Sequence, residues 1–259
     1  MQLDTIQMEI DKNIVIITFS RPQKMNTLNS QMIAELNQAL DKCTKDSAIR
    51  VIVLQGAKKY FCVGADISEV PQIANAFEGY IFLERMSEIF KKIESFPKPV
   101  IASIQGLALG GGCELALACD FRLASESAQF GLPEIEIGAF PAAGGTSRLP
   151  RIIGPTWAKE MVFLGERISA HEAYRIGLVN RVFPDETHSK EVLSFAYKLA
   201  LKPPHAIRLA KQSIDQGLSL GSYFSRIIEA LLGALILDTE DRKEGMKAFL
   251  EKRKPIFGK

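Results

Sequence analysis

The stretch that decides the fold is PVIASIQGLALGGGCELALAC, residues 99–119, in which Glu114 is the only charged residue. An apolar run, a glycine triplet and a second apolar run predict a buried strand, a tight turn and a buried helix. An unpaired carboxylate in such an interior is costly or takes a raised pKa, whereas glycine N–H groups at a helix start can hold an anion. The segment therefore indicates an acid beside a backbone anion site. The alternative is a close-packed turn and a buried helix whose Glu114 pairs with a distant Arg or Lys.

The sequence on either side alternates between strand-like and helix-like patterns. Apolar, β-branched runs at residues 14–19, 51–54 and 100–104 predict buried strands. An amphipathic helix is expected to start near Ser30, and another to precede Pro97, so the chain is predicted to be α/β. From about residue 193 helical patterns dominate, which predicts a core at 1–192 and a helical docking or oligomerisation region at 193–259.

Composition excludes several classes of protein. The 259 residues are 47% hydrophobic, which suffices for a sizeable core. A net charge of +2 gives no electrostatic footprint for nucleic acid or an anionic membrane. The four cysteines have no CxxC spacing and no metal-ligand cluster is evident, so we expect a reduced protein without a metal site. The first residues lack the features of a signal peptide, and a cytoplasmic location is expected.

Three segments contain the features that need a chemical explanation. They are FCVGADI at residues 61–67, the glycine triplet with Glu114, and FGLPEIEIG at residues 130–138, which FPAAGGTSRL follows. Taken singly, the first could be a loop in which Asp66 caps a helix, and the third a strand with Glu134 and Glu136 facing solvent. The sequence contains neither the GxGxxG fingerprint of a dinucleotide-binding fold nor the GxxxxGK[ST] motif of a P-loop. The three histidines (His171, His188 and His205) are expected at the surface.

Taken together and in order, these segments resemble the enoyl-CoA hydratase/isomerase (crotonase) family. The resemblance spans nearly the whole chain and also includes RPQKMNTL at 21–28, ERISAHEAYRIGLVN at 166–180 and DRKEGMKAFLEKRKPIF at 241–257. It implies a crotonase-like spiral of repeated strand–strand–helix units. It also implies a C-terminal helical trimerisation region and a homotrimer or homohexamer.

The resemblance also implies a site. The thioester carbonyl of an acyl-CoA would sit in an oxyanion hole made of the N–H groups of Ala65 and Gly111, which stabilises enolate-like charge. Family members that resemble hydratases carry two acids, here Glu114 and Glu134, whereas many isomerases keep only the second. The resemblance, and not the pattern, selects Glu134 over Glu136. Ala142 stands where a glycine is common in hydratases, and its N–H could help hold the water.

The activity so implied is that of an enoyl-CoA hydratase, which converts a 2-enoyl-CoA into a 3-hydroxyacyl-CoA, as in β-oxidation of fatty acids. Coenzyme A is then part of the substrate and no other cofactor is expected. Alternatives are a 3,2-enoyl-CoA isomerase, a hydratase of a cyclic enoyl-CoA from aromatic breakdown, and an RNA-associated relative. Acyl-chain length and shape would depend on residues 70–84. Residues expected to contact the coenzyme A part or the substrate are Gln23, Lys24, Val63, Ala65, Asp66, Ile67, Ala142 and, as a second candidate lysine on the last helix, Lys252.

Overall fold

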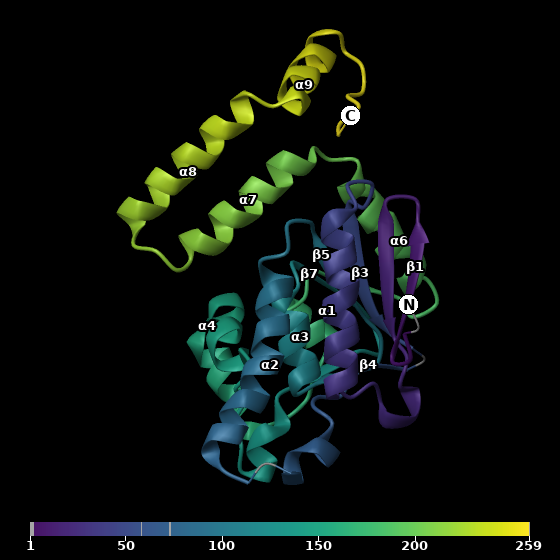
Figure 1. Ribbon diagram of the computed structural model, residues 1–259, viewed down its shortest axis with the longest axis vertical. Helices are drawn as coiled ribbons and strands as arrows, with labels where there is room; N and C mark the ends of the chain where they lie inside the picture. Colours follow the sequence, from purple (N-terminus) through teal and green to yellow (C-terminus); the bar gives the residue numbers. More distant parts are fainter. Residues whose placement is uncertain (1–2, 58, 73, 259) are drawn as a thin grey trace.

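The computed structural model describes residues 3–57, 59–72 and 74–258, and two sheets form its centre (Figure 1). In the larger sheet the order is β1-β2-β3-β5-β7-β10, with β1 antiparallel to β2 and the other neighbours parallel. Its strands are β1 (Ile6–Asp11), β2 (Ile14–Phe19), β3 (Val51–Gly56), β5 (Val100–Ile104), β7 (Phe121–Ser125) and β10 (Arg181–Phe183). The three buried strands expected from the sequence are therefore confirmed.

The smaller sheet is interleaved with the larger one along the chain. Its order is β4-β6-β8-β9, in which β4, β6 and β8 are parallel neighbours. Each of β3, β5 and β7 is followed by a strand of the smaller sheet and then by helical structure, so the chain winds as a spiral of strand–strand–helix units. The elements of this spiral are β4 (Tyr60–Cys62), β6 (Leu107–Leu109), β8 (Gln129–Gly131), β9 (Ile168–Ser169), α2 (Ala76–Glu94), α3 (Gly111–Ala118) and α4 (Gly145–Leu164).

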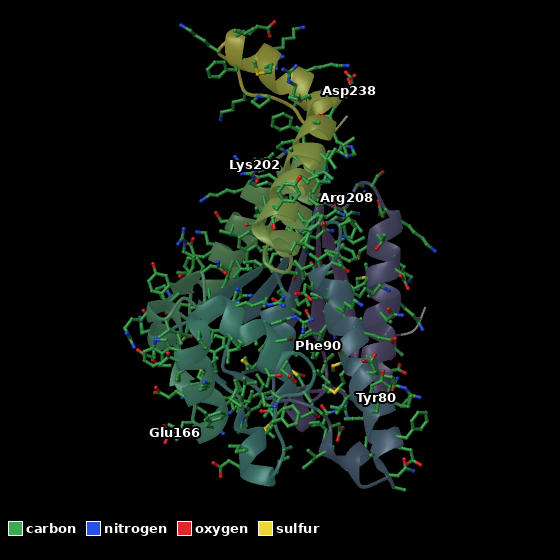
Figure 2. The ribbon with its side chains drawn as sticks, turned by 90° about the vertical axis from the view of Figure 1, so that its left-hand side faces the viewer. Tyr80, Phe90, Glu166, Lys202, Arg208 and Asp238 are labelled. Atoms are coloured by element: carbon green, nitrogen blue, oxygen red, sulfur yellow. The ribbon has the colours of Figure 1, made fainter. Side chains whose placement is uncertain are left out.

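Side chains of the large sheet alternate between two packed faces. Ile52 and Leu54 of β3 join the main core with α1 (Ser30–Lys45) and α2, whereas Val51 and Val53 pack with α6 (His188–Ala200) on the opposite face. Both faces are therefore covered, which is why these strands read as continuous apolar runs. Figure 2 shows the same sorting on α2, where Phe90 is buried in the core and Tyr80 is 58% exposed.

Local signals start the helices where the sequence indicates. The side chain of Asn29 accepts a hydrogen bond from Met32 N and caps α1, and Asn75 caps α2 by accepting from Glu78 N. Ser169 accepts from Glu172 N at the start of α5 (Ala170–Arg175), as the capping box predicts. These caps satisfy helix N–H groups that have no partner within the helix.

The C-terminal helices pack less closely than the core. They are α7 (Pro204–Gly217), α8 (Ser222–Leu237) and α9 (Glu240–Leu250), and Figure 1 shows them extending away from the two sheets. In α7 and α8 no residue is buried within the described part of the chain. The predicted division at residue 193 falls inside α6, a helix that packs on the large sheet, and the two-part organisation stays a prediction. Among the described helices none is long and apolar enough to cross a membrane.

The expected exposure of one histidine was wrong. His188 is fully buried at the start of α6, and its Nε2 lies 3.1 Å from the carbonyl oxygen of Leu123. Burial lowers its pKa, which favours the neutral ring. A polar residue in a helix-forming segment looks exposed in the sequence, but here the contact between α6 and β7 covers it. His171 and His205 are exposed as expected.

Candidate active site

The three chemical segments meet because they follow three neighbouring parallel strands. Ala65 comes after β4, Gly111 after β6 and Glu134 after β8, and the carboxyl ends of parallel strands lie at one edge of a sheet. A hydrogen bond from Gly110 N to the carbonyl oxygen of Gly131, 2.9 Å, ties the second and third segments together. The spiral thus brings together residues separated by about seventy positions in the sequence.

Two backbone N–H groups lie side by side at the start of α3. A side-chain carbon on Gly111 would lie 3.4 Å from Ala65 N, and one on Gly64 would lie 3.5 Å from Gly111 N. In the described part of the chain neither Ala65 N nor Gly111 N donates a hydrogen bond. Gly111 N also has the partial positive charge of a helix start. The pair is available to stabilise negative charge on a bound oxygen.

Close packing explains why glycine occupies this turn. A side-chain carbon on Gly112 would lie 2.1 Å from the carbonyl oxygen of Cys62, so only glycine lets α3 approach β4 this closely. Gly110 has a φ of 52°, in the left-handed region that favours glycine. The triplet therefore serves both the backbone path and the exposure of the amides.

Glu114 projects from the first turn of α3 and is only 3% exposed. Its Oε1 accepts hydrogen bonds from Ala143 N at 2.9 Å and from Gly145 N at 2.8 Å. Its pKa is raised to about 7, chiefly by burial and also by the charge of Glu134, while the two amides and the charge of Arg148 act in the opposite direction. No ion pair of Glu114 with an Arg or Lys exists among the described residues. The alternative of a simple buried ion pair is thereby wrong.

Glu134 lies in the short 3-10 turn η3 (Pro133–Ile137). Its Oε1 would be 3.2 Å from a side-chain carbon on Gly110, so the carboxyl group lies against the glycine turn. Its Oε2 is buried and has no partner among the described residues, and burial raises its pKa. Glu136 is exposed. The segment that was expected to be a strand is a 3-10 turn. This turn directs Glu134 toward the glycine turn and leaves Glu136 exposed to solvent.

Ala142 lies in the turn at residues 141–145, which follows both glutamates in the sequence. It is half-buried, and its neighbours Ala143 and Gly145 supply the amides that bind Glu114. Within the described residues the N–H of Ala142 donates no hydrogen bond. This N–H is therefore available to a water molecule, and its role in holding one stays a prediction.

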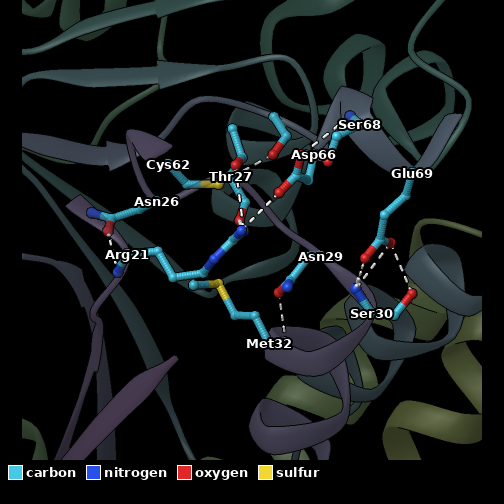
Figure 3. A network of polar contacts seen from close by, with 11 residues as sticks. Arg21, Asn26, Thr27, Asn29, Ser30, Met32, Cys62, Asp66, Ser68 and Glu69 are labelled. Atoms are coloured by element: carbon cyan, nitrogen blue, oxygen red, sulfur yellow. Dashed lines mark hydrogen bonds and ion pairs between the residues drawn. The ribbon is translucent and has the colours of Figure 1, made fainter. Parts of the chain in front are cut away.

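An ion pair that the sequence analysis missed supports the first segment (Figure 3). Arg21 Nη2 lies 2.7 Å from Asp66 Oδ2, and Arg21 Nη1 donates to the carbonyl oxygen of Thr27 at 2.6 Å. The other oxygen of Asp66 accepts from the N and Oγ of Ser68. Backbone bonds from Leu28 N to Gly64 O and from Asp66 N to Leu28 O, both 2.8 Å, complete the link. Asp66 caps a turn, and it also fixes the backbone on which Ala65 lies.

The other predicted binding residues lie around this link, with one exception. Gln23 and Lys24 are exposed on the loop after β2, Val63 is half-buried, and Ile67 is 71% exposed. Lys252 follows α9, and Figure 1 shows α9 at the top of the molecule, well separated from β4 in its lower half. Within one chain Lys252 is therefore not brought to the site.

Only part of the segment expected to bind the acyl chain can be described. Residue 73 and the side chains of residues 70–72 lie outside the described residues. The rest forms the first half of α2, which exposes Phe77 and Tyr80. Further along α2, Met86 packs against Gly111, since a side-chain carbon on that glycine would lie 2.9 Å from Met86 Cε. The second half of α2 thus contacts Gly111 of the amide pair.

Comparison with known proteins agrees with this geometry. The family model described as enoyl-CoA hydratase/isomerase matches residues 9–259. The chain is 40% identical over 258 residues to the crotonyl-CoA hydratase of Syntrophomonas wolfei, covering 99% of each chain. It is 38% identical over 255 residues to the short-chain-enoyl-CoA hydratase of Clostridium acetobutylicum, covering 98% of this chain and 97% of that one. The crystal structure of an enoyl-CoA hydratase from Bacillus anthracis superposes with a TM-score of 0.94 at 39% identity, covering 98% of this chain and 99% of that one. The chain belongs to the enoyl-CoA hydratase/isomerase family.

Proposed function

We propose that this protein is an enoyl-CoA hydratase that adds water across the 2,3 double bond of a 2-enoyl-CoA to give a 3-hydroxyacyl-CoA. The observation that carries the proposal is a pair of glutamates, the buried Glu114 and the half-buried Glu134 with its buried Oε2, beside two amides that have no partner among the described residues. An isomerase needs one acid to move a proton, whereas hydration needs a base for the water and a donor for Cα. The names of the relatives agree with the predicted hydratase activity.

The proposed mechanism uses protein groups alone. The N–H groups of Ala65 and Gly111 bind the thioester oxygen and stabilise the enolate as it forms. Glu114 accepts a proton from water, whose oxygen forms a bond to C3, and the electrons of the double bond move to the thioester. Glu134 then donates a proton to C2, which restores the carbonyl. Both carboxyl groups have raised pKa values, which suits proton transfer near neutral pH.

We further propose where the substrate lies. Its coenzyme A part would follow the exposed loop with Gln23 and Lys24, with the carbonyl oxygen of Val63 accepting from the adenine amino group and Lys24 near a phosphate. The turn at Asp66 and Ile67 would line the same path. Because two similar proteins are named for crotonyl-CoA and short-chain enoyl-CoA, we expect a short linear acyl chain. A cytoplasmic β-oxidation enzyme without a metal or separate cofactor fits this chemistry.

The test is to mix the purified protein with crotonyl-CoA and follow the ultraviolet absorbance of the conjugated enoyl thioester. We expect rapid loss of absorbance with 3-hydroxybutyryl-CoA as the product. If the protein instead converts a 3-enoyl-CoA into its 2-enoyl isomer and leaves crotonyl-CoA unchanged, the hydratase proposal is wrong. Conversion of a cyclic enoyl-CoA alone would keep hydration and overturn the short linear substrate.

We also propose that α7, α8 and α9 hold the protein together as a homotrimer or a dimer of trimers. Leu231 and Leu235 of α8 are 59% and 61% exposed, and Ile227 is 41% exposed one turn earlier on the same face. An apolar stripe of this kind is stable in water when another surface covers it. Light scattering should give the mass of a trimer or hexamer for the parent protein. The double variant that carries Leu231→Glu and Leu235→Glu should give a smaller mass. The exposed Glu229→Gln is the matched control, and a monomeric parent would contradict the proposal.

A further inference from the structure

Arg148 contacts the turn whose amides bind Glu114. It lies in the first turn of α4, and its Nη1 donates to the carbonyl oxygen of Ala143 at 3.2 Å. The N–H of this same Ala143 donates to Glu114 Oε1. One peptide group away, Arg148 N donates to the carbonyl oxygen of Gly144 at 2.8 Å. Arg148 thus binds the two carbonyl groups that lie along the chain between the two amides that Glu114 uses.

The guanidinium group also explains the shape of this turn. Gly144 has a φ of 120°, and a side-chain carbon there would lie 1.8 Å from Arg148 Nη1. The space where any other residue would place its side chain is therefore filled by Arg148. The φ of Gly144 favours glycine, and the guanidinium group of Arg148 occupies the space that this glycine leaves open.

A second contact fixes the arginine itself. Its Nη2 lies 2.8 Å from Glu94 Oε2 at the end of α2, and the Arg148 side chain is 11% exposed. An arginine can bridge a carboxylate and a carbonyl at once because its planar group carries several donors in fixed directions. The same α2 carries Met86, which packs against Gly111 of the amide pair. Arg148 consequently links α2, which contacts the amide pair through Met86, to the turn whose amides bind Glu114.

We propose that Arg148, held by Glu94, is a positioning residue for hydration. It orients the turn at residues 141–145, and its positive charge acts on Glu114. This inference rests on the proposed function, because it assumes that Glu114 is the base. The charged or titratable groups that act on Glu114 are Glu134 from η3 and Arg148 from α4, with the thiol of Cys113 beside them on α3. Burial raises the pKa of that thiol to about 12, so it stays neutral.

The sign of the effect follows from these contacts. The charge of Arg148 and the amides of Ala143 and Gly145 all lower the pKa of Glu114 against the larger effect of burial. Arg148→Met removes the charge and releases the turn, so both changes raise the pKa of the base. The acid limb of the kcat/KM profile should then move to higher pH, by about one unit. A role in stability alone would leave this limb in place.

The experiment compares pH profiles of crotonyl-CoA hydration for four proteins. Arg148→Met is expected to shift the acid limb upward and to lower kcat at pH 7 about tenfold to a hundredfold. Arg148→Lys, which keeps the charge, should shift it less. The matched control is Arg151→Met, one turn further along α4 and exposed, where the parent profile is expected. Circular dichroism establishes that each variant is folded.

The outcomes separate this inference from the function on which it rests. If Glu114→Gln lowers kcat strongly but Arg148→Met keeps the parent acid limb, the positioning role is wrong and the hydratase proposal stands. If Glu114→Gln keeps full activity, the proposed mechanism fails whatever Arg148 does. Should Arg148→Met not fold, an unshifted limb in Arg148→Lys together with full kcat overturns the positioning role.

Discussion

Asp66 and Glu114 follow neighbouring strands of the same small sheet, yet their surroundings give them opposite character. Asp66 accepts from Ser68 and is paired with Arg21, and these contacts lower its pKa to about 2. Glu114 is held by two neutral amides in an apolar interior, where burial raises its pKa to about 7. The first carboxyl group is charged, fully paired and stabilises the turn. The second has a pKa raised to near neutral pH, at a cost to stability, as the proposed role of a catalytic base requires.

The largest expected difference between these two acids is in turnover. Glu114→Gln removes the proposed base and should lower kcat for crotonyl-CoA about a thousandfold. Asp66→Asn keeps the size of the side chain and its contact with Ser68, so we expect a change in kcat of only a few-fold. Steady-state kinetics of the two variants at pH 8 measures both. An equal loss in the two would contradict the division into a structural and a catalytic carboxyl group.

The second difference is in the free energy of unfolding. A carboxyl group with a lowered pKa stabilises the folded state above its unfolded pKa, so Asp66→Asn should lower stability at pH 7 by about 1–2 kcal/mol. Glu114 has a raised pKa, so its ionisation destabilises the folded state, and Glu114→Gln should gain up to about 3 kcal/mol at pH 8. Urea unfolding of both variants tests the opposite signs. A loss of stability in Glu114→Gln would be inconsistent with this prediction.

The pH dependence of these effects is different for the two groups. The stabilisation by Asp66 should disappear as the pH falls from about 4 to about 2, through its folded pKa. The penalty from Glu114 should instead grow as the pH rises from about 4.5 to about 7. Hydration should fall about tenfold per unit below pH 7, because Glu114 must lose its proton to act as the base. A flat rate between pH 5 and pH 8 would exclude Glu114 as that base.

The smallest effect is expected at Lys24, which lies three residues from Arg21 and is exposed. Lys24→Ala should raise KM a few-fold at low salt and leave kcat unchanged, because an exposed ion pair contributes about 1 kcal/mol or less. Lys45→Ala, at an exposed lysine at the end of α1, is the matched control. An unchanged KM in Lys24→Ala would remove this lysine from the proposed coenzyme A contacts.

Much of the fold could be predicted from local patterns in the sequence. The apolar run at residues 14–19 is β2, and the run at 100–104 is β5, with the same bounds. The family and the spiral of strand–strand–helix units, implied by the resemblance, are confirmed by the family match and by the similar crystal structure. Such features are readable because burial on both faces of a strand leaves few residue types that fit.

The site depends on contacts that local patterns do not encode. The pair of Arg21 and Asp66 joins residues 45 positions apart, and nothing in either segment marks its partner. Arg148 follows Glu114 by 34 positions and contacts the backbone of a turn and not the carboxyl group itself. The only sign of this contact in the sequence is the glycine at position 144. The choice of Glu134 over Glu136 required a 3-10 turn where the pattern suggested a strand. These features arise from the way the three turns pack against one another.

The most direct test of the account is the kcat for crotonyl-CoA hydration in Glu114→Gln, in Glu134→Gln and in the double variant, with butyryl-CoA binding measured for each. If the two carboxyl groups act on one water and one substrate, each single variant loses about a thousandfold. The double variant should then lose no more than about tenfold beyond either single one, with butyryl-CoA binding retained in all three. Full turnover in either single variant would contradict the two-acid mechanism.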